Sequence, residues 1–236
     1  MLLLALLGGV APAGAQSVTV KGLITLVNRE DTGAKKSDNS NAVLWLTPVA
    51  NSLSGDLELR KQTPRPRFRL LQQHKRFEPH VLAVPVGSVV DFPNFDPFFH
   101  NVFSLFEGKR FDLGLYESGA THSVNFDRPG VCYIFCNIHP EMSAVVVVLK
   151  TSYYAISNRV GEIVINDVPP GRYLVNVWHE RCPPENLKSF PREVTISAEQ
   201  ASVGTIILRA SHDLLRSHKN KYGRDYEKPS PPTSLY

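Results

Sequence analysis

Residues 136–142 read Cys136-Asn137-Ile138-His139-Pro140-Glu141-Met142 and decide how the rest of the chain is interpreted. The stretch follows an apolar run and offers a thiolate, an imidazole and a thioether at intervals of three residues. A thiolate, two imidazoles and a weak, distant methionine form the ligand set of mononuclear electron-transfer copper sites. The sequence therefore predicts a copper site that needs a second histidine from elsewhere in the chain.

His100 is the candidate for that second histidine. It lies in Asp96-Pro97-Phe98-Phe99-His100-Asn101-Val102, between runs that predict strands over 89–92 and 102–106. Prolines at positions 93 and 97 restrict the backbone of the loop before it, as a ligand loop requires. The predicted metal ligands are therefore His100, Cys136, His139 and Met142, and we expect the two loops to meet at one end of a sandwich.

The chain resembles the cupredoxins, the plastocyanin and azurin superfamily, with a short ligand loop of the amicyanin type. The resemblance runs through residues 84–92, Asn94, 100–102 and 130–142. It implies a Greek-key β-sandwich that holds one type 1 copper ion and transfers single electrons. It also implies that Asn101 ties the two ligand loops together and that the ring edge of His139 is the electron port. Glu141 departs from the pattern, because amicyanin carries an aromatic residue there.

The remaining segments predict a second, smaller sandwich. Residues 151–210 contain a Gly-x-apolar strand start at Gly161 and the turn Pro169-Pro170-Gly171-Arg172-Tyr173, and they resemble carboxypeptidase-regulatory-like, transthyretin-type domains. Residues 18–50 predict two strands, and an isolated pair is marginal in water. Our hypothesis is one discontinuous sandwich, 18–50 with 151–210, around a copper domain at 66–150. The alternative attaches the first two strands to the copper domain.

The two ends of the chain differ in character. Residues 1–15 read as a secretory signal, since the apolar run is short and ends in a small-x-small cleavage pattern. The alternative is an uncleaved anchor. We expect a periplasmic or otherwise exported protein with no transmembrane span after cleavage. Residues 50–65 predict an exposed linker, and residues 211–236 predict a basic flexible tail.

Composition agrees with an all-β protein, since 42% of residues are hydrophobic and 18 prolines and 15 glycines supply turns. The net charge of +4 suggests an acidic partner surface at most, and we expect no nucleic-acid partner. Of three cysteines, Cys136 is assigned to the metal. Cys132 and Cys182 remain, either as a disulfide or as two buried thiols.

The other histidines are weaker candidates. His74 and His80 would bind a second metal only if folding brought them together, whereas His122 and His179 are expected at the surface. No nucleophile with a base at recognisable spacing and no glycine-rich phosphate loop is apparent, so the sequence does not predict an enzyme. The predicted function is single-electron transfer to a redox partner, such as a c-type cytochrome or a periplasmic dehydrogenase. The alternative is a copper carrier or sensor, or a non-redox structural binding module.

Overall fold

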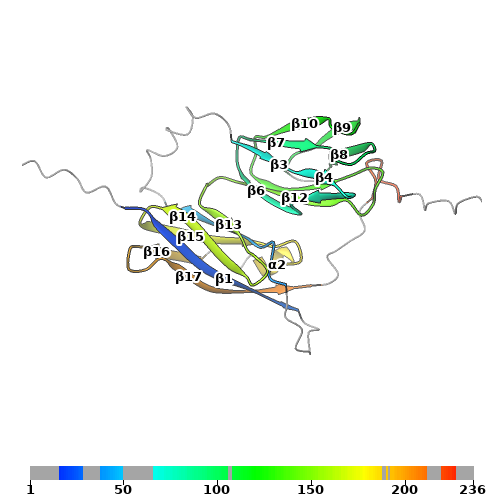
Figure 1. The fold of residues 1–236 in the computed structure, drawn as a ribbon. Helices are drawn as coiled ribbons and strands as arrows, with labels where there is room; N and C mark the ends of the chain where they lie inside the picture. The colour runs from blue at the N-terminus through cyan, green and yellow to red at the C-terminus, as the bar shows by residue number, and fades with distance from the viewer. Residues whose placement is uncertain are drawn as a thin grey trace, which may run out of the picture.

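The structure is a computed structural model, and it describes residues 16–28, 38–49, 66–105, 108–187, 190, 192–211 and 219–226. Within these ranges the chain is almost entirely β, and its helix α2 (Pro184–Leu187) is a single turn. Figure 1 shows two sandwiches, one above the other. The prediction of an all-β fold made of two sandwiches is confirmed. Several predicted features lie outside the described residues. They are the signal, the linker beyond Val49, His212, His218 and the last ten residues.

The first sandwich is formed by residues 66–149. One sheet has the order β10-β7-β3 and the other the order β6-β12-β11-β8-β9, with a small β4-β5 hairpin beside them. The strands are β3 (Arg67–Arg69), β4 (Leu71–Gln73), β5 (Arg76–Glu78), β6 (Val81–Pro85), β7 (Ser88–Pro93), β8 (His100–Ser104), β9 (Phe111–Tyr116), β10 (Thr121–Phe126), β11 (Gly130–Phe135) and β12 (Ser143–Leu149). Their inward side chains make one core, which includes Phe92, Phe126 and Ile134.

The second sandwich combines the start of the described chain with its later part. Its sheets have the orders β14-β1-β17 and β13-β2-β15-β16. The strands are β1 (Val18–Asn28), β2 (Val43–Pro48), β13 (Tyr154–Ile156), β14 (Glu162–Val168), β15 (Gly171–Trp178), β16 (Arg192–Ile196) and β17 (Ser202–Ala210). β1 pairs antiparallel with β14 and parallel with β17, and β2 lies between β13 and β15. Among the described strands, β1 and β2 therefore hydrogen-bond only within this sandwich.

Gly161 shows how closely these distant segments approach. Its carbonyl accepts a hydrogen bond from Ile24 N at 2.7 Å, and its backbone has φ +93°. A Cβ at this position would lie 2.0 Å from Ile24 O. Only glycine fits both the left-handed backbone and the close contact with β1.

The strand β12 explains how the two sandwiches pack. Its sequence is apolar on both faces, which predicts an interior strand. Val146 and Val148 face the core of the first sandwich, whereas Val145 and Val147 join a separate cluster with Trp178 of the second. β12 is therefore buried on one side by its own domain and on the other by its neighbour.

Candidate metal centre

The two predicted ligand loops meet at one end of the first sandwich. His100 opens β8, and Cys136 directly follows the last residue of β11. The two strands run antiparallel and pair at Phe135 and Phe103. The start of β8 and the end of β11 therefore lie at the same end of the sheet, although their ligands are 36 residues apart.

Three of the four predicted ligand side chains converge there. The Cys136 Sγ lies 3.7 Å from His100 Nδ1 and 3.6 Å from His139 Nδ1, and the two Nδ1 atoms are 3.1 Å apart. These three donors form the metal-capable cluster found among the described residues. His100 and Cys136 are fully buried, and His139 is half-buried.

His100 is oriented by a carboxylate that sequence analysis did not single out. Its Nε2 lies 2.8 Å from Asp96 Oδ2, so Nε2 donates to this carboxylate and Nδ1 is the ring nitrogen nearer to Cys136. Burial would raise the pKa of Asp96, but hydrogen bonds from His100 and from the amides of Lys75 and His74 outweigh it and lower that pKa. Asp96 therefore stays ionised and fixes the ring with Nδ1 pointing at Cys136. This is the carboxylate-to-histidine arrangement that supports metal ligands in proteins.

Burial shifts the pKa values of the other two donors in opposite directions. Burial raises the pKa of the Cys136 thiol, although backbone amides of Asn101, Ile138 and His139 partly offset this. A metal cation would displace the thiol proton, and the thiolate that remains would bind the metal. Burial, and then the nearby His100, lowers the pKa of His139, so its ring is neutral and available as a ligand.

The donor triangle fits a single first-row metal ion. Edges of 3.1 to 3.7 Å result when three donors each lie about 2 Å from a common ion, the usual length of a metal–nitrogen bond. The residues present therefore fit a metal with nitrogen and sulfur ligands.

Met142, the fourth predicted ligand, closes the loop. It is fully buried in the same core cluster as Cys136. Its carbonyl accepts a hydrogen bond from Cys136 N at 3.2 Å, and its amide donates to His139 O at 3.0 Å. These bonds fold the seven-residue loop back on itself, and the Met142 side chain lies in the core of the first sandwich.

Four apolar residues near the site differ in how far they are exposed to solvent. The Phe98 ring lies 5.2 Å from the His100 ring and 5.6 Å from that of His139, and Phe135 is buried. Phe99 and Ile138 are instead 53% and 43% exposed, and therefore contribute apolar surface near the site.

Asn101 differs from the role implied by the family resemblance. Its side-chain amide donates to Asp112 Oδ1 at 2.7 Å and to Gly114 O at 2.9 Å, both in β9. Its backbone amide, by contrast, is directed to the Cys136 sulfur. The tie between the ligand loops is therefore made by the main chain of Asn101, and the side chain secures β8 to β9.

The other cysteines and histidines that the structure describes lie outside this cluster. Cys132 and Cys182 are free and belong to the cores of different sandwiches, which decides between the two alternatives left open by the sequence. His122 stacks on Tyr116, as an exposed strand residue can. The surface prediction for His179 is wrong, because the ring is 3% exposed and contacts Ser40 O.

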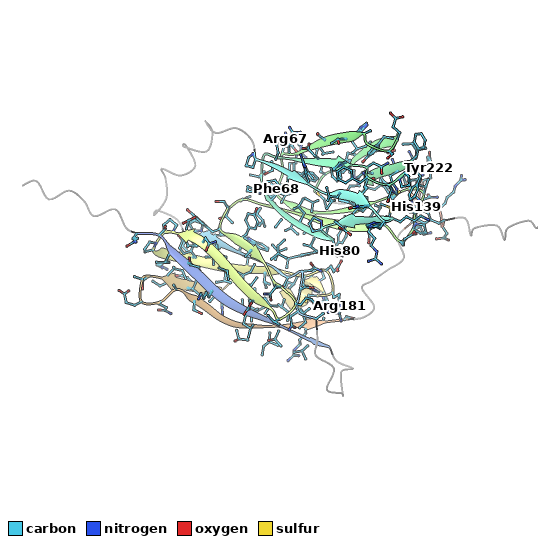
Figure 2. The ribbon with its side chains drawn as sticks, viewed as in Figure 1. Arg67, Phe68, His80, His139, Arg181 and Tyr222 are labelled. Carbon is cyan, nitrogen blue, oxygen red and sulfur yellow. The ribbon has the colours of Figure 1, made fainter. Side chains whose placement is uncertain are left out.

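His80 faces the second sandwich rather than the metal centre. Its Nε2 lies 2.8 Å from the Glu180 carboxylate, and its Nδ1 contacts Ser143 O. Figure 2 shows His80 on the side of the first sandwich that faces Arg181, whereas His139 lies at the right-hand end of that sandwich. His80 thus belongs to the contact between the sandwiches.

Solved structures with folds similar to part of this chain include a purple cupredoxin, a copper-containing nitrite reductase and an amicyanin. A purple cupredoxin from Nitrosopumilus maritimus has a TM-score of 0.32 and 24% identity, over 35% of this chain and 99% of its own. A copper-containing nitrite reductase from Thermus scotoductus SA-01 has a TM-score of 0.35 and 25% identity, over 44% of this chain and 26% of its own.

The third is an amicyanin from Paracoccus versutus, with a TM-score of 0.33 and 19% identity over 38% of this chain and 87% of its own. At these TM-scores the likenesses carry no argument about function, which rests on the side-chain geometry. No protein-family model matches the chain, and no curated protein sequence is significantly similar to it. The described part of the chain contains no helix of the length and hydropathy needed to cross a membrane.

Proposed function

We propose that residues 66–150 form a cupredoxin that binds one copper ion through His100, Cys136, His139 and Met142 and transfers single electrons. The observation that carries the proposal is the buried triangle of one sulfur and two imidazole nitrogens. Two histidines and a cysteine with a distant methionine are typical of electron-transfer copper sites. When bound, copper supplies a one-electron couple between its two oxidation states.

The protein's own contribution is to hold these donors in place. Asp96 fixes the His100 ring, and the bonds between Cys136 and Met142 fix the seven-residue loop. Donors that are already positioned move little when the charge at the site changes, which favours fast electron exchange.

The half-buried His139 offers the route to a partner. Its neighbour Ile138, and Phe99 beside His100, are exposed apolar residues. We expect a redox protein such as a c-type cytochrome or a periplasmic dehydrogenase to dock there, because electron-transfer encounters use small, short-lived interfaces. Export through the signal at residues 1–15 would place the protein with such partners. The second sandwich, proposed as carboxypeptidase-regulatory-like, would act as a tether or interaction module.

Loading the purified protein with Cu(II) tests the proposal. We expect one copper per chain and an intense visible band from sulfur-to-copper charge transfer, which bleaches on reduction. Cys136→Ser should abolish the band. The matched control is Cys132→Ser, which alters another buried free thiol of the same core and should keep it.

Other results would point to other functions. A protein that binds copper but stays colourless would be a carrier or sensor rather than an electron-transfer protein. A protein that takes up no copper would contradict the proposal and leave a non-redox structural module.

A further inference from the structure

A C-terminal segment lies against the metal end of the first sandwich. The strand β17 ends the second sandwich at Ala210, yet residues 219–226 contact the loop that carries Cys136 and His139. Figure 1 shows this segment, in red, at the end of the upper sandwich, and Figure 2 places Tyr222 near His139. These contacts correct the expectation of a flexible tail for this part of 211–236.

Two hydrogen bonds join the segment to the ligand loop. The Tyr226 hydroxyl donates to the Cys136 carbonyl at 2.7 Å, and Lys221 N donates to Asn137 Oδ1 at 3.0 Å. Both acceptors belong to the first two residues of the loop. The segment therefore holds the point at which the chain leaves β11 and turns toward His139.

The same segment also reaches the other ligand loop. Lys221 Nζ lies 2.7 Å from Asp112 Oδ2, and Asp112 Oδ1 accepts the side-chain amide of Asn101 at 2.7 Å. Asn101 directly follows His100. A continuous path of polar contacts thus runs from Asn137 through Lys221 and Asp112 to the residue beside His100.

The segment is itself a preorganised turn. The Asn220 side chain accepts hydrogen bonds from Tyr222 N and Arg224 N, each at 3.0 Å. Gly223 has φ +75°, and its amide donates to Asn220 O at 2.9 Å. Because these internal bonds fix the turn, Lys221 and Tyr226 reach their acceptors from a defined backbone.

We propose that residues 219–226 are a structural part of the metal centre, a strap that holds the Cys136 loop in register with His100. Tyr226 and Lys221 are its positioning residues. The inference rests on the proposed copper function for its effect on the metal, but the holding of the loop does not depend on it. Loosening the strap should weaken metal retention and shift the reduction potential.

Tyr226→Phe tests the strap in the copper-loaded protein. We expect copper loss to a chelator to become about twofold to tenfold faster, the scale of one net hydrogen bond. The reduction potential should fall, because the hydroxyl no longer withdraws electron density from the peptide group of the cysteine ligand. The matched control is Tyr154→Phe, which removes a half-buried hydroxyl in the second sandwich. Equal potentials, spectra and loss rates for the two variants would overturn the proposal.

A second test needs no metal. Trypsin can cut after Arg224, and we expect Asp112→Asn to speed this cleavage severalfold in the metal-free chain, because it weakens the tie to Lys221. Asp127→Asn, which alters an exposed pair with Lys109 in the same sandwich, is the control. Equal cleavage rates would show that the segment is not held. If no variant binds copper, the proposed function fails, and this assay still decides whether the strap exists.

Discussion

The two sandwiches are alike in architecture but differ in what they bury. The second buries an apolar core, with Thr151, Ser157 and His179 as its buried polar residues among those described. The first buries a larger polar set, which is Gln72, Ser88, Asp91, Asn94, Asp96, His100, Asn101 and Ser104. Burying polar groups is costly unless they are satisfied, and the linked bonds of Asn94, Asp96 and His100 mark the end of the molecule that carries chemistry.

Polar residues serve different purposes in the two regions. Ser157 accepts a hydrogen bond from Ala42 N at 2.9 Å and donates to Asn39 O at 2.6 Å, so it ties backbone segments of the second sandwich together. Asp96 instead orients a side chain, His100, toward two other donors. Variants of the second sandwich should therefore change stability alone, and variants near His100 should change metal binding.

The largest expected effect concerns the apolar core of the second sandwich. Ile24 is fully buried in β1, and Ile24→Ala should lower the free energy of unfolding by about 2–5 kcal/mol because it leaves a cavity. Urea unfolding measures this, and the visible band of the folded, copper-loaded protein should be unchanged. The control is Ile207→Ala on the adjacent β17, which is 61% exposed and should cost no more than about 0.5 kcal/mol. A changed band with Ile24→Ala would show that the core of the second sandwich also affects the metal site.

The next effect concerns the support of His100. Asp96→Asn keeps the shape of the side chain but removes the charge that orients the ring, and should weaken copper binding by about 10- to 100-fold. A competition titration with a chelator measures the affinity. Asp91→Asn is the matched control, because Asp91 is also buried in the first sandwich but pairs with Arg67. Equal affinities for the two variants would contradict the orienting role of Asp96.

A smaller effect is expected at Met142. Met142→Leu conserves volume, so the free energy of unfolding should fall by less than about 1.5 kcal/mol. We expect copper to remain bound and the reduction potential to change, since a distant thioether adds little bond energy but tunes the site. Voltammetry and metal analysis measure both. Complete loss of copper would show that the axial role of Met142 is misassigned.

The smallest effect concerns the contact between the sandwiches. The hydrogen bond that His80 donates to the Glu180 carboxylate raises the pKa of His80 above 6.5 despite partial burial. Burial opposes the shift at Glu180, but His80 outweighs it and lowers that pKa below 4.5. The contribution of His80 to the free energy of unfolding is complete below pH 6.5 and is lost as the pH rises through its raised pKa. The contribution of Glu180 is complete above pH 4.5 and is lost as the pH falls through its lowered pKa.

The His80–Glu180 pair should therefore stabilise the protein most between pH 4.5 and 6.5, by up to about 1 kcal/mol. Glu180→Gln should lower the free energy of unfolding in that window and flatten its dependence on pH. Glu185→Gln, on the exposed turn α2, serves as the control. If the free energy of unfolding of Glu180→Gln varies with pH as it does in the unaltered protein, the His80–Glu180 pair does not stabilise the fold.

Sequence patterns predict the strands and the ligand loop because the residues that define each of them lie close together in the chain. Cys136, His139 and Met142 are neighbours in one loop, and strand alternation needs only a few consecutive residues. Asp96 could have been found by the same reasoning, since it lies in the stiff loop four residues before His100. The surface prediction for His179 failed because its burial depends on Ser40, which is 139 residues away.

The sequence by itself determined an all-β chain, a Cys-His-Met loop with a histidine upstream, and a strand, β12, that is apolar on both faces. Only the tertiary structure decided that β12 packs against a second sandwich, that Asp96 aims His100, and that residues 219–226 bind the ligand loop. The physical reason is that these features are contacts between segments far apart in the chain. Tyr226 and Cys136 are 90 residues apart, and a single hydrogen bond leaves no periodic pattern in either segment.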